Sequence, residues 1–341
     1  MRLAELGFRV TALGAASVTP ATQANYLEHL ERLLTWLMLR RAPVLDKDEW
    51  DVLLTSYIEY LYDSGSTENA GGTTLAAVRW AEPAIPRPLR RGLPLASAAL
   101  AGWRRAEPGR TRPPMPREVA IAIALDLCDY GSPSLGFFVM LVFETCMRPS
   151  EALALQRFQL VPPGGIDQPG TQGCWAVLIR ALELGRPGKT GDFDGSVSID
   201  LPRHRLLVPG PEETFRMRGD RGPVFLFDYV TLLKHWRRAA CRRLGLEHLH
   251  LTPYCLRHGG ASEDRASNSR PMLEVMKRGG WKTYSSLARY EKHARLGLML
   301  QRAGPAVVAI ARRREPELTK LFLAAWQRPA GAPGSVTARS S

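Results

Sequence analysis

The sequence predicts a mostly α protein with two domains, an N-terminal helical domain and a mixed α+β domain containing a small β-hairpin or sheet. The chain has 341 residues, and at about 150 residues per domain this length favours two cores. Helical periodicity dominates before residue 106, and two β-rich segments, 175–179 and 196–200, flank a polar, glycine-containing turn. We therefore expect domains at 15–106 and 118–328, a linker at 107–117, and a Gly/Pro/Ser-rich disordered tail at 329–341.

Four amphipathic helices account for the first domain. Apolar residues recur at steps of three and four over 21–41, and Thr22 is a candidate N-cap. Further helices are expected at 48–62, from Thr73 onward, and at 95–105. The tryptophans of these helices are predicted to anchor the core rather than stack on bases; they are Trp36, Trp50, Trp80 and Trp103.

The second domain returns to helical patterns on both sides of its β-rich segments. The expected helices are 118–130, 135–145, one starting at Pro149, 229–244, 254–266, 272–277, 285–300 and 316–326. The last of these carries an apolar stripe of Leu318, Leu321, Phe322 and Trp326, which either packs on its own domain or docks on a neighbouring molecule.

Composition excludes several classes of protein. The longest strongly apolar run is far shorter than the ~20 residues of a membrane helix, and the N-terminus lacks the apolar stretch of a signal peptide. Five scattered cysteines without CxxC pairs fit neither a disulfide framework nor a zinc site. We expect a soluble intracellular protein, nuclear, cytoplasmic or nucleoid-associated.

Positive charge is the strongest feature of the composition. Lys and Arg number 46 against 33 Asp and Glu, a formal charge of +13. Such an excess favours a polyanionic partner, above all nucleic acid. A GC-rich genome would also enrich arginine, so charge alone leaves both explanations open.

Arginines concentrate around the linker. Residues 79–117 hold nine arginines against two acids. We predict that this run lies along a phosphate backbone, where each neutralised phosphate releases counterions; the alternative is a solvated charged loop. The candidate DNA-binding residues are Arg79, Arg87, Arg90, Arg91, Arg104, Arg105, Arg110 and Arg112.

The first chemically suggestive segment is Glu144-Thr-Cys-Met-Arg148-Pro-Ser-Glu151. Arg148 stands where a helix begins, and Pro149 suits the first helical position. Glu151, three residues on, lies on the same side and can orient the guanidinium. Alone, this pattern is a common helix start.

Two later segments complete the set. In Thr252-Pro-Tyr254-Cys-Leu-Arg257-His258, Tyr254 and Arg257 lie three apart on one helix face. A glycine break at 279–280 then leads to Trp281 and, nine residues later, Tyr290. Tyr284 is a rival to Tyr290 at another helical phase.

In this order, the three segments resemble the tyrosine recombinase (phage integrase) family. That family has an arginine in a T-G-x-R-x-x-E-like box, an H-x-x-R box, and a His or Trp nine residues before a nucleophilic tyrosine. It also places a lysine in a β-hairpin between the first two boxes, which Lys189 matches. The resemblance covers the whole chain in outline, because the family joins a helical, SAM-like core-DNA-binding domain to a mixed α+β catalytic domain.

The resemblance implies DNA cleavage and rejoining through a 3′-phosphotyrosine ester, as in site-specific recombination or integration of a mobile element. Arg148 and Arg257 would hold the transition-state phosphate and Tyr290 would attack it. Lys189 would protonate the leaving 5′-oxygen, Trp281 would hold the phosphate or the nucleophile, and Glu151 and His258 would support them. The implied partner is double-stranded DNA, bound by a homo-tetramer through the C-terminal helix. No metal or other cofactor is expected.

Tyr254 departs from the family pattern, because it stands where the family has histidine. A tyrosine hydroxyl donates a hydrogen bond to phosphate, but it is a poor base near neutral pH. Two alternatives to full activity therefore stay open. One is a catalytically impaired DNA-binding protein that retains the fold; the other is a type IB topoisomerase-like enzyme, which shares the chemistry without the docking helix.

Overall fold

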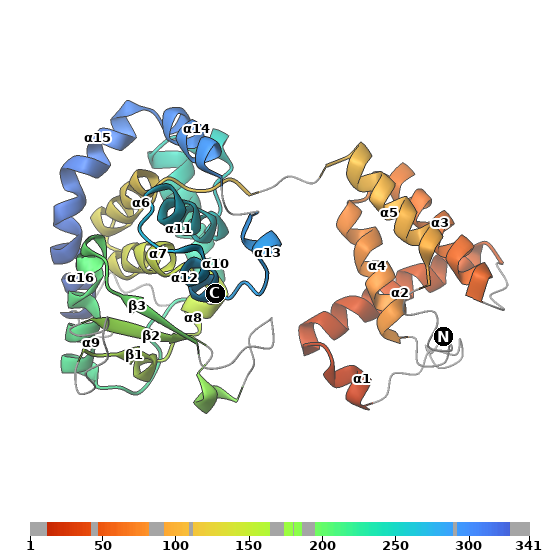
Figure 1. Ribbon diagram of the computed structural model, residues 1–341, viewed down its shortest axis with the longest axis horizontal. Helices are drawn as coiled ribbons and strands as arrows, with labels where there is room; N and C mark the ends of the chain where they lie inside the picture. Colours follow the sequence, from red (N-terminus) through yellow and green to blue (C-terminus); the bar gives the residue numbers. More distant parts are fainter. Residues whose placement is uncertain are drawn as a thin grey trace, which may run out of the picture. The chain divides into compact units, whose positions relative to one another are not determined.

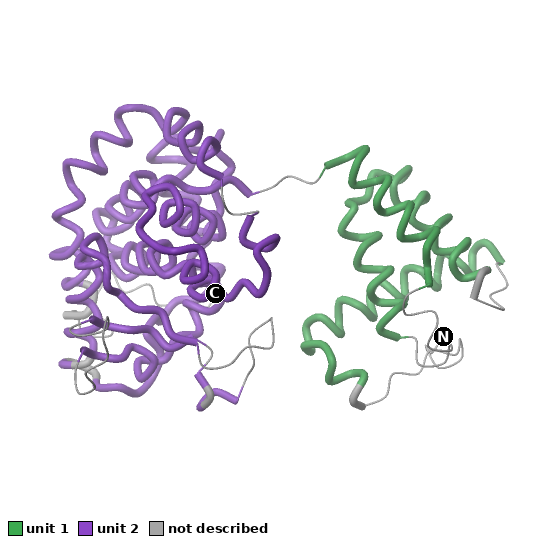
Figure 2. The backbone as a smooth tube through the Cα atoms, in the orientation of Figure 1, with its two compact units in different colours: residues 1–111 green, residues 112–341 purple. Residues whose placement is uncertain are grey.

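A computed structural model describes residues 12–41, 47–81, 92–108, 112–163, 174–179, 181–185, 195–288 and 292–327. The chain forms two compact units, residues 1–111 and 112–341 (Figure 2). The described residues are mostly helical with one small sheet (Figure 1), so the predicted fold class is confirmed.

Unit 1 is entirely helical where it is described. Its helices are α1 (Ala12–Ala16), α2 (Pro20–Leu39), α3 (Lys47–Asp63), α4 (Glu68–Ala81) and α5 (Pro94–Ala106). Trp36, Trp50 and Trp103 lie in its core, and Trp80 packs against it. The predicted N-cap was wrong by three residues: Thr19 caps α2, and its hydroxyl accepts the Thr22 N–H at 3.2 Å.

Helix α4 begins five residues before its predicted start, because the Gly71-Gly72 pair lies inside the helix. A Cβ atom on Gly71 would lie 2.9 Å from Leu100 Cδ2 and 3.2 Å from the Trp103 ring. The glycine therefore serves the close packing of α4 on α5, rather than marking a break between elements.

Unit 2 is built around a buried helical pair. Helices α6 (Arg117–Asp129) and α7 (Pro133–Thr145) pack together, with α11 (Tyr254–Ala266) against α7. The remaining helices are α8 (Pro149–Leu153), α9 (Pro209–Arg218), α10 (Tyr229–Trp236) with its π-helical continuation Arg237–Arg243, α12 (Met272–Gly279), α13 (Tyr284–Ala288), α14 (His293–Ala303), α15 (Pro305–Arg314) and α16 (Leu318–Gln327). Short 3-10 turns occupy Arg157–Gln159, Leu182–Leu184, Pro202–Leu207, Glu247–Leu249 and Glu315–Glu317.

Three antiparallel strands form the sheet along one edge of unit 2 (Figure 1). They are β1 (Leu160–Val161), β2 (Trp175–Ile179) and β3 (Gly195–Ile199), in the order β1-β2-β3. Alternate residues of β2 are buried, so its inner face joins the helical core while the outer face is less covered.

One prediction about the C-terminal region was wrong. The single helix expected over 285–300 is two helices, and Lys292, the N-cap of α14, has a non-helical backbone (φ −127°, ψ 56°). Of the two alternatives for the apolar stripe, packing on its own domain describes Leu318 and Phe322, because both are completely buried in the core of their own unit. The Phe322 ring meets the Phe137 ring edge-on, with centroids 5.5 Å apart. The side chain of Trp326 lies outside the description.

Candidate functional site

Arg148 is held at the junction of α7 and α8. It is the N-cap of α8, with Pro149 at the first helical position. Glu151 accepts the Arg148 backbone N–H at 2.9 Å and its Nη1 at 2.6 Å. The side chain of Arg148 is mostly buried, and this two-point contact fixes its guanidinium at the start of the helix.

Cys146 makes the turn that presents Arg148. Its backbone is left-handed (φ 55°, ψ 21°) and its side chain is fully buried. A left-handed conformation costs a non-glycine residue roughly 1 kcal/mol, and this is the position at which the T-G-x-R box has glycine. Burial, then the charge of Asp264, raises the pKa of the thiol to about 12, so Cys146 is an inert thiol here.

Arg257 joins all three motif segments. Its side chain is 1% exposed. Nη1 donates to the Cys146 carbonyl at 2.6 Å and Nη2 donates to the Gly279 carbonyl. The guanidinium carbon lies 4.3 Å from the centroid of the Trp281 ring. Cys146, which lies 111 positions before Arg257 in the sequence, and Gly279, which lies 22 positions after it, thus both contact one buried guanidinium.

Backbone packing on α11 depends on the two glycines that follow His258. A Cβ atom on Gly259 would lie 2.1 Å from the Met115 carbonyl oxygen, and one on Gly260 would lie 2.0 Å from the Phe143 carbonyl oxygen. Only glycine lets the segment before α6, and α7 itself, approach α11 this closely. The Gly259-Gly260 dipeptide therefore positions both neighbours of the site, a signal that was readable in the sequence and was missed.

Tyr254 lies between two arginines. The Arg112 guanidinium carbon is 4.4 Å from the centroid of its ring. Burial lowers the pKa of Arg148, but Glu151 and, to a smaller extent, Tyr254 raise it, so the net pKa lies above its ordinary value. Tyr254 is thus near enough to Arg148 to affect its pKa, and it presents its ring face to Arg112.

His258 lies one helical turn beyond Tyr254, with ring centroids 5.7 Å apart. Burial, followed by the charges of Lys292, Arg112 and Arg257, lowers its pKa to about 3. The imidazole is therefore neutral near pH 7 and sits in a strongly positive field. Lys292 belonged to no motif and was missed; its Nζ lies 3.3 Å from the Arg112 carbonyl oxygen.

A buried ion network supports the end of α7. The Glu144 carboxylate accepts from Arg117 Nε and Arg203 Nε, each at 2.9 Å. Burial would raise the pKa of Glu144, but the adjacent His204 ring and the two arginine charges lower it to about 2. Arg278 donates to the Glu144 carbonyl at 2.7 Å and to the Ser198 carbonyl at 2.8 Å, which holds α12 and β3 against α7.

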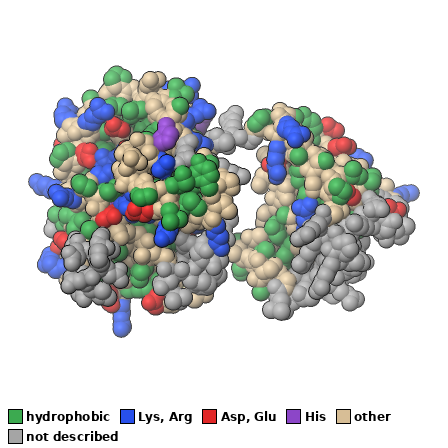
Figure 3. Space-filling view, in the orientation of Figure 1, with side chains coloured by type: hydrophobic (Ala, Val, Ile, Leu, Met, Phe, Trp, Pro, Cys, Tyr) green, Lys and Arg blue, Asp and Glu red, His purple; other side chains and the backbone are tan. Residues whose placement is uncertain are grey.

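The other predicted residues are distributed as follows. Lys189, Tyr290, Arg87, Arg90, Arg91 and Arg110 lie outside the described residues. Arg79 Nη2 donates to Ser97 Oγ at 2.9 Å, and Arg104 pairs with Glu68 at 2.8 Å. Arg105 is exposed, as is Tyr284. On the face in Figure 3, lysines and arginines are spread over unit 2 rather than gathered in one stripe.

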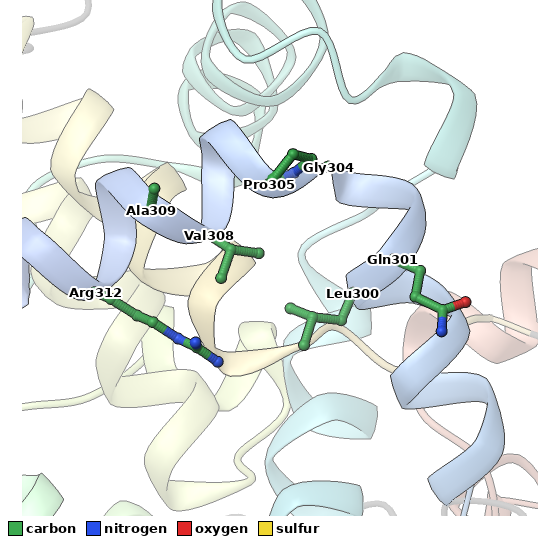
Figure 4. Close-up of a pocket in the computed structure, with 7 residues that line it drawn as sticks. All are labelled: Leu300, Gln301, Gly304, Pro305, Val308, Ala309 and Arg312. Carbon is green, nitrogen blue, oxygen red and sulfur yellow. The ribbon is translucent and has the colours of Figure 1, made fainter.

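A groove of about 630 Å³ between α14 and α15 is separate from these residues (Figure 4). Its lining is largely apolar and includes Leu300, Val308 and Arg312. It contains no group able to attack or protonate a substrate. Within the described ranges, no set of three His, Cys, Asp or Glu side chains could hold a metal, and no described helix has the length and apolar character to cross a bilayer.

Two solved structures are among those similar to this chain. No protein-family model matches the sequence, and no curated protein matches it. A structure described as a lambda integrase(75-356) dimer bound to a COC' core site is 13% identical, covers 82% of this chain and 92% of its own, and has a TM-score of 0.48. XerA recombinase is 14% identical, covers 86% of this chain and 95% of its own, and has a TM-score of 0.37. Both are tyrosine recombinases, the family that the order of the motifs indicated.

Proposed function

We propose that the chain binds duplex DNA and cleaves and rejoins its strands through a phosphotyrosine ester on Tyr290. The observation that carries the proposal is the position of Arg257, whose guanidinium bonds the Cys146 and Gly279 carbonyls and stacks on Trp281. This arrangement gathers residues from all three motif segments. A site made of two oriented arginines suits a reacting phosphate, because each guanidinium keeps its positive charge and stabilises negative charge beside it.

In the proposed reaction, the Tyr290 hydroxyl releases its proton to water as its oxygen attacks phosphorus and replaces the 5′-oxygen of the strand. The phosphoryl group is then esterified to tyrosine, and a proton from Lys189 neutralises the departing 5′-oxygen. Arg148 and Arg257 stabilise the added negative charge on the non-bridging oxygens. Reversal of the same steps rejoins the strand, and because the ester conserves the bond energy, no nucleotide cofactor is consumed.

Trp281 supports this site through Arg257. Its side chain is 9% exposed, and its ring lies 4.3 Å from the guanidinium carbon. A cation held against an aromatic face is attracted by the ring quadrupole. We therefore assign Trp281 first to fixing the plane of Arg257, with its N–H as a second contact to the phosphate or the nucleophile.

A second function, DNA binding without cleavage, is favoured by the surroundings of Tyr254. Its proximity to Arg148, whose pKa it raises, and its ring contact with Arg112 suit a positioning group rather than a base. The tetramer predicted from the resemblance would require a contact other than the stripe of Leu318 and Phe322, which the core of unit 2 already covers.

A covalent-trapping assay separates the two functions. Duplexes that the protein binds are first selected from a randomised pool, then remade with nicks so that a short 5′-hydroxyl fragment diffuses away after cleavage. Cleavage predicts a protein–DNA adduct that withstands denaturation and is lost in Tyr290→Phe and Arg257→Lys. Retained binding with no adduct in the unsubstituted protein would favour the non-catalytic function.

A further inference from the structure

The segment before α6 carries Arg112 to the edge of the candidate site. Arg112 itself is exposed, but the residues after it are anchored: Pro114, Met115 and Pro116 are buried. Met115 N–H donates to the Cys255 carbonyl at 3.3 Å, and its own carbonyl packs against Gly259. The position of Arg112 is therefore set by backbone contacts with α11.

Lys292, which lies 180 residues after Arg112 in the sequence, also lies beside the candidate site. It is the N-cap of α14, two residues after Tyr290 in the sequence, and its Nζ lies 3.3 Å from the Arg112 carbonyl oxygen. Two side chains on α11 experience both charges: Arg112 and Lys292 each lower the pKa of His258, and each opposes the rise that burial gives the pKa of Cys255. The two cations thus face the first turn of α11 together.

Tyr254 connects this pair to the motif arginines. Its ring lies under Arg112, and it is close enough to Arg148 to raise the pKa of that guanidinium. The ring of His258 lies next to it, with centroids 5.7 Å apart. Tyr254 is therefore close to both Arg112 and Arg148. Phosphates repeat along a DNA strand, so a second cationic site near the first suits an adjacent anion.

We propose that Arg112 and Lys292, with Tyr254 and His258 between them and the motif arginines, form a subsite for a backbone phosphodiester next to the reacting phosphate. The tyrosine ring at position 254 then has a role that the smaller histidine ring would fill less well, because the face of the tyrosine ring supports Arg112. The inference rests on the proposed function in that the anion is taken to be DNA backbone. It adds a residue, Lys292, that belongs to no motif.

The first experiment measures DNA affinity against salt in Tyr290→Phe, so that strand cleavage plays no part. Arg112→Ala/Lys292→Ala removes the contacts with one phosphate and should lower the slope of log affinity against log salt by about 0.9. The matched control is Arg313→Ala/Lys320→Ala, which removes the same charges from exposed positions on α15 and α16. An unchanged slope in the first pair, or equal changes in both pairs, would overturn the subsite.

The second experiment reads the subsite by NMR through the His258 imidazole, whose signal is identified by its loss in His258→Gln. Bound phosphate should offset the surrounding positive charge and raise the pKa of His258 by about one unit or more. Duplex DNA should give this rise in Tyr290→Phe and give a smaller one in the Arg112/Lys292 variant. No rise with DNA, or a rise produced by inorganic phosphate but not by DNA, would overturn the assignment to a DNA phosphodiester.

These results are independent of the proposed chemistry. A reduced salt slope and a DNA-dependent shift at His258 without any covalent adduct would support the subsite and reject cleavage. An adduct on Tyr290 with neither effect would support cleavage and reject the subsite.

Discussion

Replacing Gly260 with alanine tests how closely α7 and α11 pack around the site. The added Cβ would lie 2.0 Å from the Phe143 carbonyl oxygen, whereas ordinary van der Waals contact begins near 3.4 Å. The two backbones must therefore separate by about 1.4 Å. Overpacking of this kind costs up to about 3 kcal/mol, and the gain in helix propensity returns about 1 kcal/mol. The expected net loss is about 2 kcal/mol.

The matched control is Gly297→Ala in α14. A Cβ atom added to Gly297 would meet no described atom within 4 Å, so alanine should stabilise unit 2 by up to about 1 kcal/mol. For a unit of about 230 residues, 1 kcal/mol shifts the Tm by roughly 2–4 °C. Gly260→Ala should therefore lower the Tm of unit 2 by about 4–8 °C, and Gly297→Ala should raise it by about 2–4 °C.

Differential scanning calorimetry of the full chain is the measurement. A third variant, Gly102→Ala, identifies the transition of unit 1, because Gly102 lies in α5 and its Cβ would also meet open space. If Gly260→Ala raised the Tm of unit 2 as Gly297→Ala does, the close approach of α7 to α11 would be refuted. The close packing that lets Arg257 reach the Cys146 carbonyl would then be refuted as well.

Three further predictions concern pH, capping and thiols. Because the folded pKa of Glu144 is depressed from 4.5 to about 2, its contribution to stability is present above about pH 4.5 and is lost as the pH falls toward 2. The loss is on the order of 3 kcal/mol, so the Tm of unit 2 should fall in this pH window. A fall of the same size in Glu144→Gln would contradict this prediction. Asp51 accepts the Leu95 and Ala96 N–H groups at 2.9 Å and so caps α5. In urea titrations, Asp51→Ala should destabilise unit 1 by about 1–3 kcal/mol and Asp51→Asn by less. Equal stability of both variants and the unsubstituted protein would refute the cap. Mass spectrometry after brief alkylation at pH 8 should find label on Cys174 and Cys241, which are half-buried, before Cys146; early labelling of Cys146 would show that its thiol is accessible.

Periodicity and motif order anticipated much of this molecule. Apolar spacing located most of the helices, because burial of one helix face imposes its period directly on the sequence. The β-rich segments were correctly placed to within a residue, since 175–179 and 195–199 are strands. The order of Arg148, Arg257 and Trp281 pointed to one site, and the structure brings the latter two into contact.

The sequence could not predict contacts made by backbone atoms or contacts between residues that are far apart along the chain. Arg257 bonds two carbonyl groups, which carry no residue-specific signal. The stripe of Leu318 and Phe322 has the same spacing whether it packs within the chain or on a neighbour, so periodicity could not decide between them. Lys292 approaches Arg112 across 180 residues of chain, and no motif spans such a distance.

The most direct test of the central claim is to identify the residue that becomes linked to DNA. A bound, nicked duplex is incubated with the protein, the adduct is digested with nuclease and protease, and the modified peptide is sequenced by mass spectrometry. The account predicts a phosphonucleotide on Tyr290, and none on the rival Tyr284. An adduct on Tyr284, or no adduct on DNA that the protein demonstrably binds, would contradict it.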